Sequence, residues 1–288
     1  MKCLIVGGQG QVGSAIQATA PSSVSLFAPT RGECDLTAAD QVENWLVRVR
    51  PDILFNAAAY TAVDAAEGDP AAADRVNGEG PGVLAEAARR YGARLVHIST
   101  DFVFDGQASQ PYSPAAQPNP LSVYGRTKLR GEVEAQRAGR ELLIVRTSWV
   151  YAERGKNFVH TMLKLMRERD EVRVVADQIG TPTYARNLGR ALWGLCAANA
   201  SGIYHFTDEG VASWYDFAMA IQEEALALGI LRTAAKIIPI ATNEYPTPAK
   251  RPGFSVLDKS KTRAAIGSSG QHWRAALRDM LGKVNSDG

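Results

Sequence analysis

The chain has few cysteines and no long apolar run, and both absences narrow the class of protein. Its cysteines, at positions 3, 34 and 196, are scattered and supply no disulfide framework, which favours the reducing cytoplasm. No apolar stretch reaches membrane length, and the run at 3–6 is too short for the core of a signal peptide. We therefore expect a cytoplasmic protein with no membrane partner.

An excess of charge of one sign is also absent. The sequence holds 32 Lys and Arg residues against 30 Asp and Glu residues, a formal net charge of +2. Such a balance creates no strong field for nucleic acid or for an anionic membrane. The histidines lie far apart, at 97, 160, 205 and 272, with no metal-ligand spacing. We expect neither a nucleic-acid partner nor a metal.

Glycines follow the first apolar run and predict a dinucleotide site. Cys3 to Val6 reads as a short buried strand, glycines stand at 7, 8, 10 and 13, and a helix-like segment comes next. Gly8, Gly10 and Gly13 fit G-x-G-x-x-G, while Gly7, Gly10 and Gly13 fit G-x-x-G-x-x-G. Glycine permits the tight turn, and the helix N-terminus offers free N–H groups to a pyrophosphate. The alternative is an ordinary βα turn without a ligand.

The end of the second predicted strand, at 24–28, lacks the acidic residue that often binds the ribose of NAD. Thr30 and Arg31 stand there instead. Arg31 either holds a 2′-phosphate, which favours NADPH with NADH still possible, or is a solvated surface arginine. Asp35 either accepts an adenine amino proton or caps a helix that begins near Ala38.

Apolar and amphipathic segments alternate, which predicts an α/β fold with a Rossmann-type doubly wound parallel sheet. The predicted strands lie at 3–6, 24–28, 53–56, 94–98 and 142–146, and the helices at 11–19, 38–49, 71–91, 122–137 and 157–169. Beyond residue 150 the pattern changes to short strands at 172–176 and 202–206, helices at 184–198 and 213–228, and a proline-rich loop at 243–253. We expect an NAD(P)-binding domain over 1–150 that also receives 182–207. A smaller C-terminal α/β substrate lobe is expected mainly over 151–288.

Tyr124 and Lys128 are four residues apart, which places them on one face of a predicted helix. A nearby ammonium lowers the pKa of a tyrosine, and the lysine can also bind the nicotinamide ribose. Tyr124 could then protonate a carbonyl oxygen while hydride reaches carbon. Thr100, at the carboxyl end of a predicted strand, could hold the same oxygen. The spacing alone also arises by chance, but beside the glycine turn it predicts a catalytic group of Thr100, Tyr124 and Lys128.

Three further candidates have open alternatives. Ala57, Ala58 and Ala59 follow the third strand, where small residues let a cofactor pack on backbone or let a helix approach the sheet closely. Trp149 could stack on a sugar or fill a core between lobes. Arg251 could pair with a diphosphate or lie on the surface.

Longer motifs resemble the dTDP-4-dehydrorhamnose reductase family of the extended short-chain dehydrogenase/reductases. They span nearly the whole chain, at 50–52, 56–67, 99–104, 124–132, 146–151, 177–183 and 245–252. The runs 61–67, 146–151 and 245–252 are the most specific. The resemblance implies reduction, with NADPH or NADH, of the C4 ketone of dTDP-4-dehydro-L-rhamnose, which gives dTDP-L-rhamnose in the last step of its synthesis.

The resemblance also implies roles by position. Catalytic roles fall on Thr100, Tyr124 and Lys128. Cofactor contacts fall on the pyrophosphate loop, the adenine site and the loop past the third strand: Gly10, Gln11, Val12, Asp35, Leu36, Ala59, Tyr60 and Thr61. Substrate contacts fall on Asp101 and Trp149, with neighbours Val63, Phe102, Asn157 and Arg251.

One departure concerns a metal. Some members of the family dimerise around a magnesium ion held by glutamates, but the corresponding positions here are Ala15 and Arg186. We therefore expect a monomer or weak dimer without that bridge. Three rivals stay open: a reductase of another dTDP-4-ketosugar, as in dTDP-dihydrostreptose formation; a regulatory subunit like the β subunit of methionine adenosyltransferase; and an epimerase or dehydratase with bound NAD.

Overall fold

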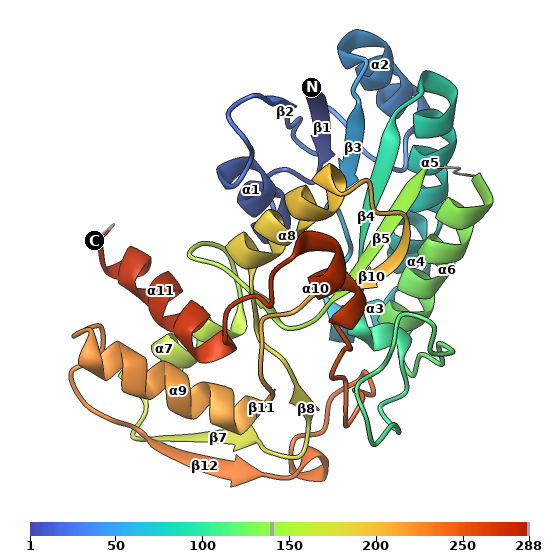
Figure 1. The fold of residues 1–288 in the computed structure, drawn as a ribbon. Helices are drawn as coiled ribbons and strands as arrows, with labels where there is room; N and C mark the ends of the chain where they lie inside the picture. Colours follow the sequence, from blue (N-terminus) through green and yellow to red (C-terminus); the bar gives the residue numbers. More distant parts are fainter. Residues whose placement is uncertain (139–140, 287–288) are drawn as a thin grey trace.

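A six-stranded parallel sheet forms the centre of the computed structural model, which describes residues 1–138 and 141–286 (Figure 1). The strand order is β10 (Gly202–His205), β5 (Leu142–Thr147), β4 (Arg94–Thr100), β3 (Ile53–Asn56), β1 (Lys2–Val6) and β2 (Ser25–Phe27). β1 pairs with β2 on one side and with β3 on the other, so the chain runs outward from β1 to β2 and then returns past β1 to β3. In such sheets ligands bind at the carboxyl ends of the strands where the order reverses, here between β1 and β3.

Helices cover both faces of this sheet, and the strands are apolar on both faces for that reason. Cys3 and Ile5 of β1 face a core shared with α1 (Gln11–Ala18) and α8 (Ala185–Ala197). Leu4 and Val6 face the opposite core, shared with α2 (Ala39–Val49), α5 (Gly80–Tyr91) and α6 (Val123–Ala138). The predicted α/β class and doubly wound parallel sheet are confirmed.

The helix predicted at 71–91 is wrong as one element. It divides into α4 (Pro70–Asp74), a π-helical turn η1 (Arg75–Glu79) and α5, and a further helix, α3 (Val63–Gly68), precedes it. The side chain of Asn77 accepts from the Tyr60 amide at 2.8 Å and donates to the Tyr60 carbonyl at 3.0 Å. This tertiary bond lies within the widened turn and fastens it to the loop after β3.

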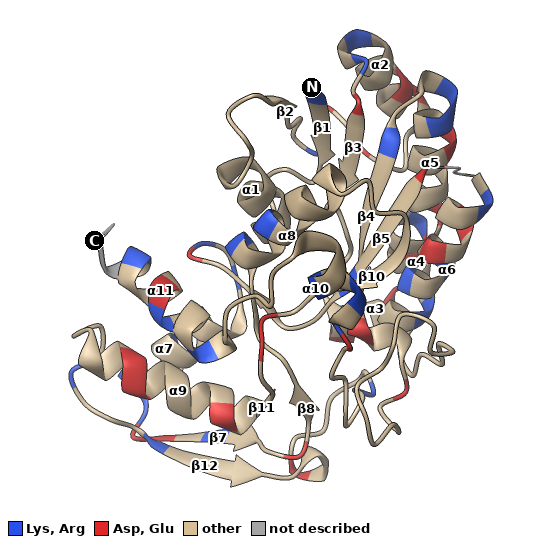
Figure 2. Ribbon diagram, in the orientation of Figure 1, with Lys and Arg blue, Asp and Glu red and all other residues tan. Residues whose placement is uncertain are grey.

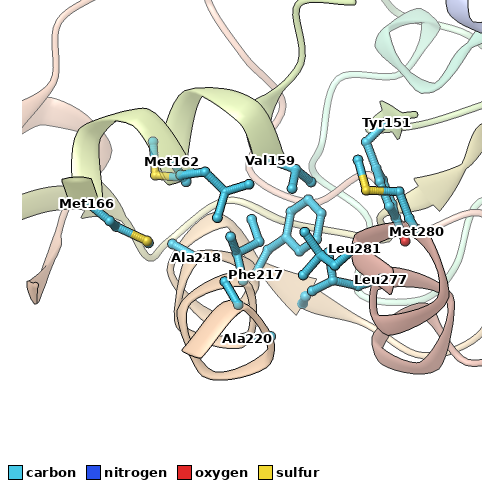
Figure 3. Packing of buried hydrophobic residues seen from close by; sticks show 14 of the residues in the cluster. Tyr151, Val159, Met162, Met166, Phe217, Ala218, Ala220, Leu277, Met280 and Leu281 are labelled. Atoms are coloured by element: carbon cyan, nitrogen blue, oxygen red, sulfur yellow. The ribbon is translucent and has the colours of Figure 1, made fainter. Parts of the chain in front are cut away.

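A second core fills the helical lobe, which we define as α7 (Phe158–Glu168), α9 (Trp214–Ala227) and α11 (Trp273–Ser286) with the parallel strands β7 (Glu171–Val175) and β12 (Lys236–Ile240). Figure 3 shows Phe217 of α9 at its centre, between Val159 of α7 and Leu277 of α11. Figure 2 marks acidic residues on α9 and basic residues on α11, and ion pairs such as Arg278–Glu224 join the two helices.

The lobe and the sheet are joined by several short elements. They are connected by two strand pairs: β6 (Val150–Tyr151) with β9 (Thr183–Tyr184), and β8 (Ile179–Gly180) with β11 (Ala212–Ser213). The fold is completed by two 3₁₀ turns, η2 (Asp101–Val103) and η3 (Thr242–Glu244), and by helix α10 (Ser260–Ile266). Residues 139–140 and 287–288 of the expected domains lie outside the described residues. Within the described ranges, no helix has the length and apolarity that a membrane span requires.

Candidate active site

The glycine turn after β1 leaves an open cradle at the N-terminus of α1. Gly7 has φ +81°, and a Cβ on it would lie 2.5 Å from the Ala58 amide nitrogen. A Cβ on Gly13 would collide with the Gly7 carbonyl oxygen, so both glycines are needed for packing. Gly10, the N-cap of α1, differs because a Cβ there would meet only the Gly7 oxygen, at 3.4 Å. No side chain caps this helix, so its first N–H groups and the space beside Gly10 fit a pyrophosphate.

Two neighbouring cavities run from this cradle along the carboxyl edge of the sheet. The larger has a volume of about 1070 Å³ and the smaller about 240 Å³, and the same five residues line both: Gln9, Gly10, Ala57, Ala58 and Ala59. The small cavity holds the predicted adenosine end, with Arg31, Asp35 and Leu36. The large cavity holds the predicted reacting groups. The two cavities together make an elongated track that suits a dinucleotide.

Thr100, Tyr124 and Lys128 all line the large cavity. Thr100 ends β4, and its Oγ1 donates to Asp101 Oδ1 at 3.1 Å and accepts from the Phe102 amide at 3.2 Å. Lys128 stands one turn after Tyr124 on α6, and its Nζ donates to the Ile98 carbonyl at 2.7 Å. The structure therefore brings all three predicted catalytic side chains to one wall.

The expected lowering of the Tyr124 pKa is wrong for this structure. Burial raises the pKa of Tyr124 to about 12, the charge of Asp101 adds to the rise, and hydrogen bonding with Thr100 opposes it. Burial also lowers the pKa of Lys128 to about 8. Desolvation, rather than pairing with Lys128, sets the pKa of Tyr124, so Tyr124 is a neutral proton donor at physiological pH.

Asp101 and Phe102 follow Thr100 and also line the large cavity. Burial raises the pKa of Asp101 to about 6, although hydrogen bonding from Ser255 and Thr100 lowers it in part. The Phe102 ring meets the Tyr124 ring edge to face, with centroids 5.5 Å apart.

Trp149 lines the large cavity together with Trp214, a residue that the sequence interpretation missed. The two indoles stack with centroids 3.5 Å apart, and Trp149 has the unusual φ of +48°. A Cβ on Gly180 would lie 2.7 Å from the Trp149 ring, so the glycine makes room for it. Nothing in the sequence pairs these tryptophans, because they lie 65 positions apart and meet only through the packing of the lobe on the sheet.

Val63 and Arg251 form another part of the wall of the large cavity. The Arg251 guanidinium forms a bidentate pair with Asp64, at 3.1 and 2.8 Å, and also donates to the Thr247 hydroxyl. The proline-rich loop predicted at 243–253 is therefore held against α3 at the cavity. Arg251 is therefore not a free surface charge, because Asp64 is its anionic partner.

Asn157 does not line either cavity, in contrast to its expected place beside substrate. Its Nδ2 donates to Gln11 Oε1 at 3.0 Å and to the Ala152 carbonyl at 2.9 Å, and its Oδ1 caps α7 through the His160 amide. Gln11 also donates to the Lys156 carbonyl. Asn157 thus connects the pyrophosphate loop to the helical lobe, and Gln11 and Val12 line the large cavity.

The remaining cofactor candidates are placed as follows. Arg31 is 84% exposed and pairs with Asp35 at 3.6 Å, at the rim of the small cavity. The proposed capping role of Asp35 is wrong, since Ala38 is the N-cap of α2 and Asp35 binds the amide and hydroxyl of Thr37.

Two other cofactor candidates do not line the track, and one does. Thr30 donates to the Glu33 carboxylate and lines neither cavity. Tyr60 also lines neither cavity, and its backbone amide donates to the Asn77 side chain. Thr61 lines the large cavity.

Ala15 of α1 and Arg186 of α8 both line the large cavity. Arg186 Nε pairs with the Glu153 carboxylate at 2.6 Å, so a cationic side chain already occupies this part of the wall. Among residues 1–138 and 141–286, no group of three or more His, Cys, Asp or Glu side chains is arranged to hold a metal ion. The absence of a magnesium bridge stays a prediction.

The sequence matches the family described as "RmlD substrate binding domain" over residues 1–286. The dTDP-4-dehydrorhamnose reductase of Burkholderia thailandensis is 42% identical, over 98% of this chain and 99% of that protein. Crystal structures of dTDP-4-dehydrorhamnose reductases are similar too. That of Clostridium acetobutylicum has 37% identity and a TM-score of 0.92 over 99% of both chains. That of Bacillus anthracis, in complex with NADP, has 33% identity and a TM-score of 0.93 over 98% of this chain and 99% of the other.

Nearly full coverage of both chains, together with the match over 1–286, leaves no large part of the sequence unrelated. The chain belongs to the dTDP-4-dehydrorhamnose reductase family, within the extended short-chain dehydrogenase/reductases.

Proposed function

We propose that this chain reduces the C4 ketone of dTDP-4-dehydro-L-rhamnose to dTDP-L-rhamnose with NADPH. The observation that carries the proposal is a pair of neighbouring cavities that share five lining residues. They lie beside the uncapped N-terminus of α1, and Thr100, Tyr124 and Lys128 line the larger one. Family membership supports the same chemistry, because the relatives named above carry this name and one was solved with NADP.

The cofactor would lie along this track. Gly10 and the first turn of α1 would hold its pyrophosphate, and Asp35 and Leu36 would face the adenine. Arg31 at the rim would suit a 2′-phosphate. Ala57, Ala58 and Ala59 let it lie close to backbone. When bound, the nicotinamide supplies the hydride.

The chain's own groups handle the proton. Thr100 and Tyr124 orient the ketone oxygen by hydrogen bonds, and Tyr124 donates its proton to that oxygen. With a pKa raised to about 12, Tyr124 carries this proton at neutral pH. Lys128 would hold the nicotinamide ribose, and its ammonium would offset the charge that the departing proton leaves on Tyr124.

The substrate would occupy the rest of the large cavity, with Asp101, Phe102 and Trp149 around the sugar and Val63 and Arg251 on the nucleotide side. We propose that residues 1–150 with 182–207 bind the cofactor and that 151–288 mainly bind the dTDP-sugar. We also propose a cytoplasmic location and a monomer or weak dimer.

The test supplies dTDP-4-keto-6-deoxyglucose with its 3,5-epimerase and NADPH, and identifies the product by NMR. Formation of dTDP-L-rhamnose with one NADPH consumed per sugar would support the proposal. The control is Tyr124→Phe, which should bind NADPH normally and lose most turnover, by a factor of about 10² to 10⁴. Reduction of another dTDP-ketosugar in its place, or cofactor binding without turnover of any, would refute the proposed substrate or the proposed activity.

A further inference from the structure

Behind the reacting groups lies a buried ion pair that the proposed mechanism does not use. Glu132 stands one turn after Lys128 on α6, and its side chain and that of Arg146 on β5 are each 2% exposed. Glu132 Oε1 accepts from Ser99 Oγ at 2.5 Å and from Arg146 Nε at 2.9 Å, while Oε2 accepts from Arg146 Nη2 at 2.6 Å. Glu132 lines neither cavity, so it cannot touch substrate or cofactor there.

We propose that Glu132 is a positioning residue that keeps the buried Lys128 side chain charged and aimed at the cofactor track. This inference rests on the proposed function. Residues four apart on a helix are neighbours, and a buried ammonium needs an anion nearby to remain charged. Burial lowers the pKa of Lys128, and the carboxylate of Glu132 opposes that change.

The other titratable groups near Lys128 do not supply a negative charge that keeps it protonated. His97 of β4 is buried, and both desolvation and the Lys128 charge hold its pKa well below the usual value, so it is neutral. Tyr124 is neutral below about pH 12. Asp101 of η2 bonds to Thr100. Of these groups, only Glu132 raises the pKa of Lys128.

The carboxylates on the helices that pack against α6 have other partners than Lys128. Glu67 of α3 accepts from the Val123 amide at the start of α6. Asp74 and Glu79 pair with Arg130 at the surface. Arg146 of β5 is the cation that pairs directly with Glu132, while the Lys128 ammonium donates to the Ile98 carbonyl.

The Glu132–Arg146 ion pair allows a test with two variants. Each breaks the same ion pair, but they should change the pH at which Lys128 loses its proton differently. Glu132→Gln removes the carboxylate one helical turn from Lys128, so Lys128 should lose its proton at lower pH. Arg146→Met keeps that carboxylate and removes the cation paired with it, so the proton should be lost at the same or a higher pH. A merely structural ion pair would give both variants the same pH dependence.

The readouts are the NADPH dissociation constant by cofactor fluorescence and kcat/KM, each measured from neutral to alkaline pH. For Glu132→Gln, we expect the midpoint of the alkaline loss to fall by about one pH unit or more in both readouts. Glu132→Asp, which keeps the carboxylate, should restore most of the shift. Glu224→Gln is the matched control, because Glu224 is a similarly buried carboxylate between Arg274 and Arg278, and it should keep the wild-type midpoint.

Removal of one partner of a buried ion pair strongly destabilises a fold and can prevent folding. In that event Glu132→Gln/Arg146→Met removes both charges together, and its midpoint should also lie below that of the wild type. The proposal would be overturned if Glu132→Gln and Glu132→Gln/Arg146→Met both kept the wild-type midpoint. It would also be overturned if Glu132→Gln and Arg146→Met shifted the midpoint equally. NADPH binding does not need ketone reduction, so a protein that binds NADPH but reduces no dTDP-sugar would contradict the proposed function and still test Glu132.

Discussion

Trp149 and Trp214 lie flat against each other, with planes 7° apart, although one follows the central sheet and the other begins α9 of the helical lobe. Phe158 of α7 packs on the Trp214 indole, with ring centroids 4.6 Å apart. The stack therefore fixes one wall of the large cavity across the junction of sheet and lobe. Since Trp149 has a positive φ, its orientation depends on this support.

We predict that Trp214→Ala weakens substrate binding and leaves NADPH binding unchanged. Loss of the aromatic partner, worth about 0.5–1.5 kcal/mol, should raise KM by about two- to tenfold. Steady-state kinetics and an NADPH titration measure both effects. Trp214→Phe keeps a ring and should lie near the wild type; an equal loss in both variants would contradict a stacking role.

Asn157 is expected to couple the lobe to the pyrophosphate loop. Asn157→Ala loses the α7 cap, which costs about 1 kcal/mol of stability, and also loses the bond to Gln11. Asn157→Ser keeps a good cap, but its short side chain cannot reproduce the amide's bonds. We therefore predict that both variants bind NADPH more weakly and that only Asn157→Ala is markedly less stable. Normal NADPH affinity in Asn157→Ser would exclude the coupling.

Gly10 and Gly13 should respond differently to a methyl group. Gly10→Ala adds it in the open cradle at an ordinary φ of −74°, so we expect less than about 1 kcal/mol of destabilisation and at least a tenfold loss of NADPH affinity. Gly13→Ala drives it into the Gly7 carbonyl and should cost about 1–3 kcal/mol of stability. Denaturant unfolding and cofactor titration separate the two effects. Full NADPH affinity in Gly10→Ala would mean that the pyrophosphate binds elsewhere.

Asp101 should make stability depend on pH. Its pKa is raised to about 6 in the fold, above the value of about 3.9 for an unfolded chain, so the native state binds more protons between these values. The stabilisation is complete below about pH 4 and is lost as the pH rises through 6. Relative to the wild type, Asp101→Asn should therefore gain melting temperature between about pH 4 and pH 7. Asp208, whose pKa burial raises to about 7, titrates in the same direction and remains in both proteins, so parallel melting curves would contradict the assignment to Asp101.

The parts of the fold and site that the sequence predicted are those with local signals. The glycine spacing, Tyr124 with Lys128 on one helix face, and the alternation of strands and helices all depend on neighbours in the chain. The π-turn was missed because it accompanies a tertiary bond from Asn77 to the Tyr60 backbone, which no helical periodicity encodes.

The errors within the site have the same origin. The raised pKa of Tyr124 follows from burial, and burial depends on the whole fold rather than on the Tyr-x-x-x-Lys spacing. Trp214 lines the cavity only because the lobe carries it there. The bond from the Asn157 amide to Gln11, 146 residues earlier in the chain, has no local signal either, and a place for Asn157 beside substrate stays a prediction.

The central claim is that hydride passes from the nicotinamide to C4 of the sugar while Tyr124 supplies the proton. The most direct measurement uses NADPH deuterated at the transferable position of the nicotinamide, in the epimerase-coupled reaction, with NMR of the purified dTDP-sugar. We predict one deuterium at C4 of dTDP-L-rhamnose for each NADPH oxidised, and almost no labelled product with Tyr124→Phe. A product without deuterium at C4, or deuterium incorporation at the wild-type rate in Tyr124→Phe, would contradict the account.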